Sequence, residues 1–412
     1  MSLRDLPPRR VLPDDVRDRL RAEVRQGIAK PRRSRHVWYA AAAAVLVLAA
    51  GAVVVTRQLR TPVEAPPATT NTGLTLDAKL ATSALDRCWA AVRTAGKTGR
   101  VADRADWVPL FTDTFGTDSV VAATAAGKPM FCEVTETTVT LSDPAAAPAY
   151  APGSRSGLLL HSATGLAAGV VDPAWPQANL ATKSAGGSSS ASGLDFSPAS
   201  RQFVAFTGTV PAKVELAIGD GPGEQPMFRL PEAPPPLLSV TDRPADAERT
   251  SAAGRALGEC LAAAEEVVAD APAYRAGPSL AERGYRIVLG RLGDRVVACT
   301  TEPGPAGPRS HAYPDRYTGP AVPARSLVVD TLGATEGGGQ DRPRTPFAAV
   351  VPSTATQVIV DYGGGNGADT LVTDGMFAVW LPVGRLKPDA KGHVKAWDAR
   401  GTVVYDGMLP LF

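Results

Sequence analysis

The residues with the most specific chemistry in this sequence are four cysteines, at positions 88, 132, 260 and 299. Cysteines can form disulfides, bind a metal as thiolates, or act as a redox pair. A metal site needs more ligands at short spacings, and a redox pair favours a C-x-x-C motif near a helix N-terminus. The sequence has no C-x-x-C motif, and its four histidines are scattered along the chain. We therefore expect structural disulfides, with no metal, cofactor or redox site.

An internal repeat favours one of the three possible pairings. ALDRCWAAV at 84–92 matches ALGECLAAA at 256–264 at five positions, with an offset of 172 residues. In both segments the cysteine lies among apolar residues spaced i, i+3, i+4 and i+7, which form one face of a helix. The second cysteine of each pair lies in a strand–turn–strand pattern, at 119–134 and 285–301. Bonds between the copies and free buried thiols are the alternatives. The predicted bonds are Cys88–Cys132 and Cys260–Cys299.

A second match connects the copies further along the chain. Residues 203–223 align without a gap to 347–367 at an offset of 144, and both read as a strand running into a glycine-rich loop. The smaller offset predicts an insertion in the first copy, and the low-complexity stretch KSAGGSSSASG at 183–193 is typical of a flexible loop. The second copy ends in a predicted hairpin with its turn at 399–401, which the first copy lacks.

These patterns predict an α+β fold class. We expect two tandem repeat-related domains, at 78–240 and 242–412, each with a helix clipped by a disulfide to a mostly antiparallel sheet. Residues 57–77 are rich in Pro and Thr without periodicity, which indicates an extended linker.

Residues 37–56 predict one transmembrane helix, because twenty uncharged residues at 1.5 Å each span a hydrocarbon core of about 30 Å. Eleven basic residues precede this segment and two follow it in the next twenty, which places the N-terminus in the cytoplasm and the C-terminal domains outside. The alternative is a cleaved signal peptide with AAGA at 49–52. The predicted membrane-interface residues are Arg32, Arg33, Arg35, Trp38, Tyr39 and Arg57.

Residues 1–36 form a short basic cytoplasmic leader. Apolar residues recur every four positions from Val16 to Ile28, beside a basic stripe, and predict an amphipathic helix. Such a helix could lie on anionic lipid, dock a cytosolic protein, or serve only to orient insertion.

No catalytic motif occurs: the chain lacks a G-x-S-x-G elbow, an H-E-x-x-H pair and a phosphate-binding P-loop. The glycine run at 363–367 precedes a strand pattern, so we interpret it as a hairpin loop and not as a dinucleotide site. From Asp77 onward 30 basic residues face 35 acidic ones, which argues against nucleic acid as a partner. We expect no catalytic residue.

The sequence thus indicates a single-pass membrane-anchored protein of a bacterial envelope, with 34 Arg against 9 Lys pointing to a high-GC genome. Its extracytoplasmic tandem domains would bind or sense without catalysis, and its partners would be the lipid bilayer and an unknown envelope or cytosolic protein. The alternatives are an exported, hydrolase-like enzyme and a structural or assembly component of the envelope. A large cleft with converging polar groups would favour the enzyme, and a flat apolar patch would favour assembly.

Overall fold

The computed structural model describes residues 73–116, 118–184, 189–221, 227–264, 266–304, 307–315, 317, 322–330, 332, 345–363, 366–381 and 390–411. They belong to one compact unit, Thr69–Phe412. The predicted leader, the predicted membrane span and the six predicted membrane-interface residues lie outside the described residues. Among the described residues, no helix is long and apolar enough to cross a bilayer.

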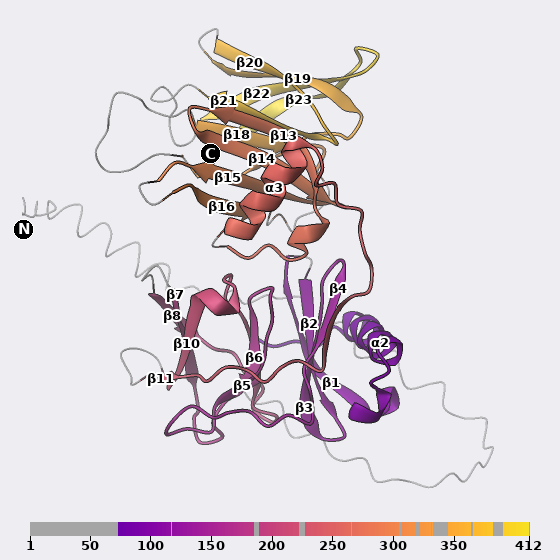
Figure 1. The fold of residues 1–412 in the computed structure, drawn as a ribbon, viewed down its shortest axis with the longest axis vertical. Helices are drawn as coiled ribbons and strands as arrows, with labels where there is room; N and C mark the ends of the chain where they lie inside the picture. Colours follow the sequence, from indigo (N-terminus) through magenta and orange to yellow (C-terminus); the bar gives the residue numbers. More distant parts are fainter. Residues whose placement is uncertain are drawn as a thin grey trace, which may run out of the picture. The chain divides into compact units, whose positions relative to one another are not determined.

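The first half of the described chain, residues 78–241, begins with a helix and continues in strands (Figure 1). Its elements are α2 (Ala78–Thr94), β1 (Trp107–Phe115), β2 (Asp118–Ala125), β3 (Lys128–Val134), β4 (Thr138–Leu141), β5 (Gly157–His161), β6 (Leu166–Val170), β7 (Ala178–Ser184), β8 (Ser189–Gly193), β9 (Gln202–Phe206), β10 (Val214–Asp220), β11 (Phe228–Arg229) and β12 (Leu238–Thr241).

The second half, residues 252–410, repeats this plan. Its elements are α3 (Ala252–Ala263), β13 (Arg275–Glu282), β14 (Tyr285–Leu292), β15 (Arg295–Glu302), β16 (Arg309–Pro314), β17 (Arg325–Leu327), β18 (Thr345–Val350), β19 (Ala355–Gly363), β20 (Asn366–Leu371), β21 (Met376–Leu381), β22 (Lys391–Asp398) and β23 (Val403–Pro410). Short 3-10 turns also occur, at Thr98–Arg100, Arg104–Asp106, Pro211–Lys213 and Ala271–Ala273.

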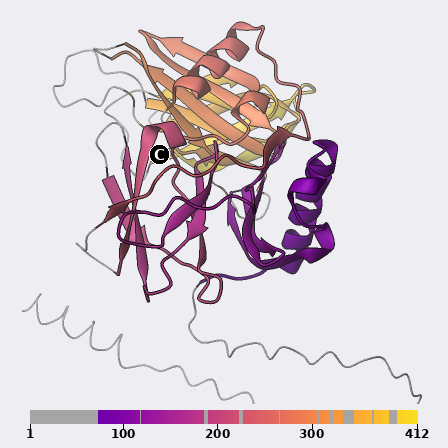
Figure 2. The ribbon, with the colours of Figure 1, turned by 60° about the horizontal axis from the view of Figure 1, so that its bottom comes forward.

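The first half is built in layers, with α2 against the first of three antiparallel sheets (Figure 2). We name the sheets A (β1-β2-β3-β4-β12), B (β5-β6-β9) and C (β11-β10-β7-β8). Leu85 and Val121 are buried between α2 and sheet A. Phe131 and Leu166 are buried between sheets A and B, and Phe203 between B and C. Each sheet therefore packs an apolar face on its neighbour, which is the usual way to bury a sheet.

The second half has the same layers in the same order. Its sheets are A′ (β13-β14-β15-β16), B′ (β17-β18-β21) and C′ (β23-β22-β19-β20). Leu257 and Val297 pack between α3 and A′, Leu289 and Ala348 between A′ and B′, and Phe377 between B′ and C′. Taken in chain order, β1 to β11 occupy the places of β13 to β23, and β12 is an additional strand of sheet A. The chain is thus a mostly antiparallel α+β fold with a tandem repeat.

This topology corrects the sequence alignment of the second part of the repeat. The offset of 144 pairs Phe203 on β9 with Phe347 on β18, but β18 is the central strand of B′ and β9 is an edge strand of B. The equivalent of β9 is β21, so Phe203 corresponds to Phe377, and both lie in the core between the second and third sheets. The 144-residue match was wrong because short apolar strands resemble one another when only their period-two pattern is compared.

Two further expectations about the first copy depended on the same incorrect alignment and were also wrong. The stretch at 183–193 is not an insertion, because its first two residues end β7 and its last five form β8. The pair β7–β8 corresponds to the hairpin β19–β20 of the second half. The terminal hairpin β22–β23 also has a counterpart in the first half, the pair β10–β11, in which β11 has only two residues. The first copy is therefore not trimmed.

Both helices begin at a capping side chain. The Asp77 carboxylate accepts hydrogen bonds from the backbone N–H groups of Lys79 and Leu80, at 2.9 and 3.0 Å. The hydroxyl of Ser251 accepts one from Gly254 at 2.9 Å. These caps satisfy N–H groups that the first helical turn leaves without partners, so both helices start several residues before the repeated cysteine motif.

Each helix is covalently attached to the central part of its first sheet. Cys88 of α2 is bonded to Cys132 of β3, and Cys260 of α3 to Cys299 of β15, which is the pairing that the repeated pattern predicts. All four sulfur atoms are buried in the core between helix and sheet.

Removing the first disulfide with the double substitution Cys88→Ala and Cys132→Ala is expected to lower the free energy of unfolding by about 2–4 kcal/mol, because the bond closes a long loop in the unfolded chain. Urea unfolding followed by tryptophan fluorescence measures this change. The matched variant lacking Cys260 and Cys299 should lose a similar amount, since the sequence separations are 44 and 39 residues. An unchanged urea midpoint in both variants would contradict the prediction.

Candidate functional site

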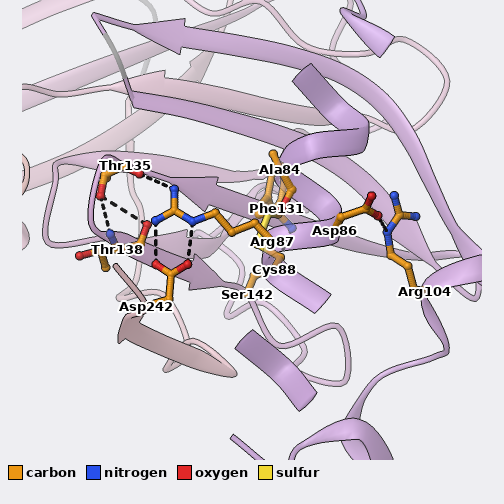
Figure 3. Close-up of a disulfide and its surroundings, with 11 residues drawn as sticks. Ala84, Asp86, Arg87, Cys88, Arg104, Phe131, Thr135, Thr138, Ser142 and Asp242 are labelled. Carbon is orange, nitrogen blue, oxygen red and sulfur yellow. Dashed lines mark hydrogen bonds and ion pairs between the residues drawn. A yellow bond between two sulfur atoms is a disulfide. The ribbon is translucent and has the colours of Figure 1, made fainter. Parts of the chain in front are cut away.

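The turn between β3 and β4 is held from one side by Arg87, the residue before Cys88 on α2 (Figure 3). The Arg87 guanidinium donates to the carbonyl oxygen of Thr135 at 2.6 Å. It also donates to both carboxylate oxygens of Asp242, each at 2.7 Å, in a bidentate pair. Because Asp242 directly follows β12, Arg87 joins the helix, the turn and the connection that leads to the second half.

Asp270 of the second half holds the same turn from the other side. Its buried carboxylate accepts hydrogen bonds from the hydroxyls of Thr135 and Thr137, both at 2.6 Å, and from the N–H of Glu136 at 3.0 Å. Arg295 donates to it at 2.9 Å. Burial alone would raise the pKa of Asp270, but the two hydroxyls and the Arg295 charge outweigh it and hold this pKa below its ordinary value.

Arg295 also faces a second carboxylate, that of Asp118 on β2. Arg295 Nη1 lies 3.5 Å from Asp118 Oδ1, and this buried oxygen has no hydrogen-bond partner among the described residues. Only 6% of Asp118 is exposed. Burial raises its pKa to about 6 against the effect of Arg295, and the Asp270 and Glu136 charges add to the rise. A buried acceptor without a donor is costly, and such groups in native proteins frequently serve a ligand or a water molecule.

A cavity of about 1010 Å³ lies beside Asp118 and is lined by both halves. The first half contributes the tip of the β1–β2 hairpin, and the second half contributes the β14–β15 hairpin, the segment after β16 and the turn after β18. The volume is at the upper end of the range of small-molecule sites, roughly 300–1,000 Å³. Its charged and aromatic lining residues are Asp118, Asp294, Asp315, Arg291, Arg295, Arg325, Phe115, Tyr274 and Tyr317.

The polar groups of the cavity are largely held in place by one another. Arg325 donates to Asp315 at 2.6 Å, and Arg291 donates to the carbonyl oxygen of Gly293 at 2.8 Å. Tyr274 is almost fully buried, with the Arg295 guanidinium 5.7 Å from its ring centre. The floor of the cavity is therefore preorganised, which lowers the entropic cost of binding a ligand.

Glu133 on β3 is a second buried carboxyl, in the core between sheets A and B. It is 1% exposed, and its Oε1 accepts hydrogen bonds from the hydroxyls of Ser162, at 3.1 Å, and Thr164. Its Oε2 has no partner. Burial raises the pKa of Glu133 to about 7 despite these two hydroxyls, and the Asp118 and Asp270 charges raise it further. Glu133 does not line the cavity, so we expect it to affect the stability of the fold and not the binding of a ligand.

The cysteines could be identified from the sequence, but four charged residues could not. They are Asp118 and Arg295, which line the cavity, Asp270, which binds Arg295, and Glu133 in the core between sheets A and B. One of them carried a signal: Glu133 interrupts the apolar strand pattern MFCEV, and a charged residue at an apolar position is unusual in a core. Asp270 and Arg295 carried none, because they meet the first half only through tertiary contacts.

No family model matches the chain, and no curated protein matches it. Among solved structures, the chain is similar to the crystal structure of a tetra-tandem repeat in the extending region of a large adhesion protein, at 10% identity and a TM-score of 0.14. That alignment covers 73% of this chain and 97% of the other. At this TM-score the similarity supports no conclusion about fold or function.

Proposed function

We propose that this chain is a single-pass, membrane-anchored binding or sensing protein of a bacterial envelope, and that its ligand occupies the cavity beside Asp118. The observation that carries the proposal is a cavity of small-molecule size with charged side chains converging on it. The Asp118 carboxylate and the Arg295 guanidinium border this cavity with 9% and 15% of their side chains exposed, and a pocket with a few such polar groups is typical of a small-molecule site. The paired arginines and aspartates around it hold the lining rigid, which suits recognition.

The proposed location rests on two independent observations. The sequence carries twenty uncharged residues at 37–56 behind eleven basic ones. All four cysteines lie after this segment and are joined in disulfides, which persist in oxidising compartments outside the cytoplasm. In this proposal the leader stays in the cytoplasm, where it orients the span or contacts a cytosolic partner, and the tandem repeat lies outside.

A topology experiment tests the proposed anchoring. The full chain carries one epitope tag before Met1 and another after Phe412 in intact bacterial spheroplasts exposed to a protease. We expect the C-terminal tag to be lost and the N-terminal tag to be protected, on a fragment that stays in the membrane. Substitution of Ala49 and Ala52 by Leu should leave the size of the mature protein unchanged. A mature protein shortened near residue 52, and longer after these substitutions, would contradict an uncleaved anchor in favour of a signal peptide.

A role in envelope assembly is the second candidate, and one observation favours it. On sheet C′ the side chains of Ile359 and Leu371 are 41% and 72% exposed. The equivalent positions of sheet C, identified from the strand register, hold Ala181 and Gly193. The second half thus exposes large apolar side chains where the first half does not, and such surfaces are typical of protein contacts. An assembly role predicts a protein over this face, whereas the binding role predicts a small ligand in the cavity.

A further inference from the structure

We infer that the cavity beside Asp118 binds a neutral saccharide, an inference that rests on the proposed binding function of this cavity. Three features of the lining carry it: the balance of its charges, the hydrogen-bonding capacity of its floor, and its exposed aromatic side chains. Each feature either argues against charged or apolar ligands or favours uncharged ligands with many hydroxyl groups.

The charges of the lining argue against an ionic ligand. Three arginines and three aspartates face the cavity, so it has no net charge. A cationic group reaching Asp118 Oδ1 would also approach Arg295, whose Nη1 lies 3.5 Å from the same oxygen. An anionic group reaching Arg295 would approach Asp118 and Asp270 instead. Since like charges at such distances repel strongly in a partly buried site, the floor favours an uncharged ligand.

The floor offers a hydroxyl-bearing ligand both kinds of hydrogen bond. The Asp118 carboxylate lines the cavity with 9% of its side chain exposed, and it is an acceptor that is ionised above its pKa of about 6. The neighbouring guanidinium of Arg295 is a donor with several N–H groups. A sugar hydroxyl is both donor and acceptor, so two adjacent hydroxyls match this carboxylate–guanidinium pair. An apolar ligand would remove water from the exposed part of this carboxylate and guanidinium without replacing its hydrogen bonds, which is costly.

The walls supply the apolar surface that a sugar ring needs. Phe115 and Tyr317 both line the cavity and are 41% and 45% exposed, and the Arg325 guanidinium lies 5.5 Å from the centre of the Tyr317 ring. Phe115 is held by stacking on Phe206, with ring centres 5.2 Å apart. Pyranose rings present C–H groups on their faces, and these pack on aromatic rings while the hydroxyls at the ring edge form hydrogen bonds. Aromatic walls around a carboxylate and an arginine therefore fit a saccharide better than a peptide, which needs donors and acceptors along an extended edge.

Calorimetric titration of the full chain in lipid nanodiscs at pH 8 tests this inference. The probes are the neutral trisaccharides cellotriose, maltotriose, mannotriose and chitotriose, with trigalacturonate as the anionic and spermidine as the cationic comparison. We expect at least one neutral trisaccharide to bind at least tenfold more tightly than both charged probes. Tighter binding of a charged probe, or no binding of any neutral probe, would overturn the inference.

Substitutions of cavity-lining residues test whether the trisaccharide binds in this cavity. Asp118→Ala and Tyr317→Ala are each expected to weaken binding of the trisaccharide at least tenfold. Tyr150→Ala is the matched control, because Tyr150 is 50% exposed and does not line the cavity, and it should leave binding unchanged. Thermal melting of each variant checks folding, and Asp118→Asn serves if Asp118→Ala does not fold. Equal affinity in all variants would exclude this cavity as the binding site.

A second titration separates this inference from the proposed function. Soluble fragments of bacterial envelope are treated either with periodate, which cleaves the vicinal diols of sugars, or with protease, and titrated against the same protein. Binding that periodate abolishes and protease spares supports a saccharide. Binding that periodate spares would overturn the saccharide inference and leave the binding function standing. The absence of any binding, to fragments or to trisaccharides, would overturn both.

Discussion

The protein is expected to be more stable at pH 5 than at pH 8, by about 4 kcal/mol in the free energy of unfolding. Two buried carboxyls cause this difference. Burial raises the pKa of Glu133 from 4.5 to about 7 and that of Asp118 from 3.8 to about 6. Each pKa unit corresponds to about 1.4 kcal/mol, so between pH 5 and 8 Glu133 contributes roughly 2.5 kcal/mol and Asp118 roughly 1.5 kcal/mol.

The direction of this pH dependence follows from whether the folded or the unfolded chain binds more protons. Between pH 4 and 7 the folded chain keeps protons on Glu133 and Asp118 that the unfolded chain has lost, so stability falls as the pH rises through this window. His161 acts in the opposite sense, since burial lowers its pKa and its unfolded form gains a proton below about 6.5. Asp270, whose pKa is lowered, stabilises the fold above its ordinary value of 3.8 and loses this effect only at lower pH.

Urea midpoints measured from pH 4.5 to 8.5 test this prediction. Glu133→Gln keeps an acceptor for Ser162 and Thr164 but cannot ionise, so more than half of the pH dependence should disappear. Asp118→Asn should remove most of the remainder. The exposed control Asp374→Asn should keep the full profile, because its side chain is 45% exposed beside Arg275. A wild-type midpoint that is constant or rises from pH 5 to 8 would show that the two carboxyls are not buried as described.

Asp270→Asn is expected to lower the free energy of unfolding by about 3–5 kcal/mol. The substitution leaves the largely buried Arg295 with only the longer contact to Asp118, at 3.5 Å, and breaking a buried ion pair typically costs this amount. The amide also replaces one carboxylate oxygen with a donor, which opposes the donors of Glu136 and Arg295. Asparagine tolerates the left-handed backbone of this position, where φ is 57°, so the loss would report on the network and not on backbone strain.

Urea unfolding and limited proteolysis measure the effect together. We expect a lower midpoint and faster cleavage between β12 and α3, where the connection leaves the first half. Arg275→Gln is the control, because its contact with Asp374 is 3.7 Å long and exposed, and exposed pairs contribute about 0–1 kcal/mol. If Asp270→Asn costs no more than Arg275→Gln, the network around Asp270 does not stabilise the contact between the halves.

The parts of the fold that could be predicted from sequence are those encoded by local patterns. The i, i+3, i+4 spacing around Cys88 and Cys260 places each cysteine on the buried face of a helix, and α2 and α3 have this arrangement. The strand–turn–strand patterns that contain Cys132 and Cys299 correspond to the hairpins β2–β3 and β14–β15. Repetition of both patterns was sufficient to choose the disulfide pairing.

The third sheet and the cavity could not be predicted in this way. The strand β8 consists of Ser, Ala and Gly, all exposed, so neither propensity nor alternation distinguishes it from a flexible loop. Its pairing with β7 is decided by the backbone hydrogen bonds of the hairpin. The contacts of Asp270 with Thr135 and Thr137 cross more than 130 residues, and no local pattern records such a distance.

The position of the disulfides also determines how the protein would respond to tension. A force applied at Asp77, where the predicted linker ends, can unravel α2 only as far as Cys88, because the load then passes through the covalent bond into β3. The 44-residue loop behind this bond cannot extend, which withholds roughly 150 Å of contour length, and the second bond withholds roughly 130 Å. The disulfide of each half thus limits how far that half can be extended. A chain under tension would lengthen in short steps, and the strands between the two bonded cysteines would carry no force.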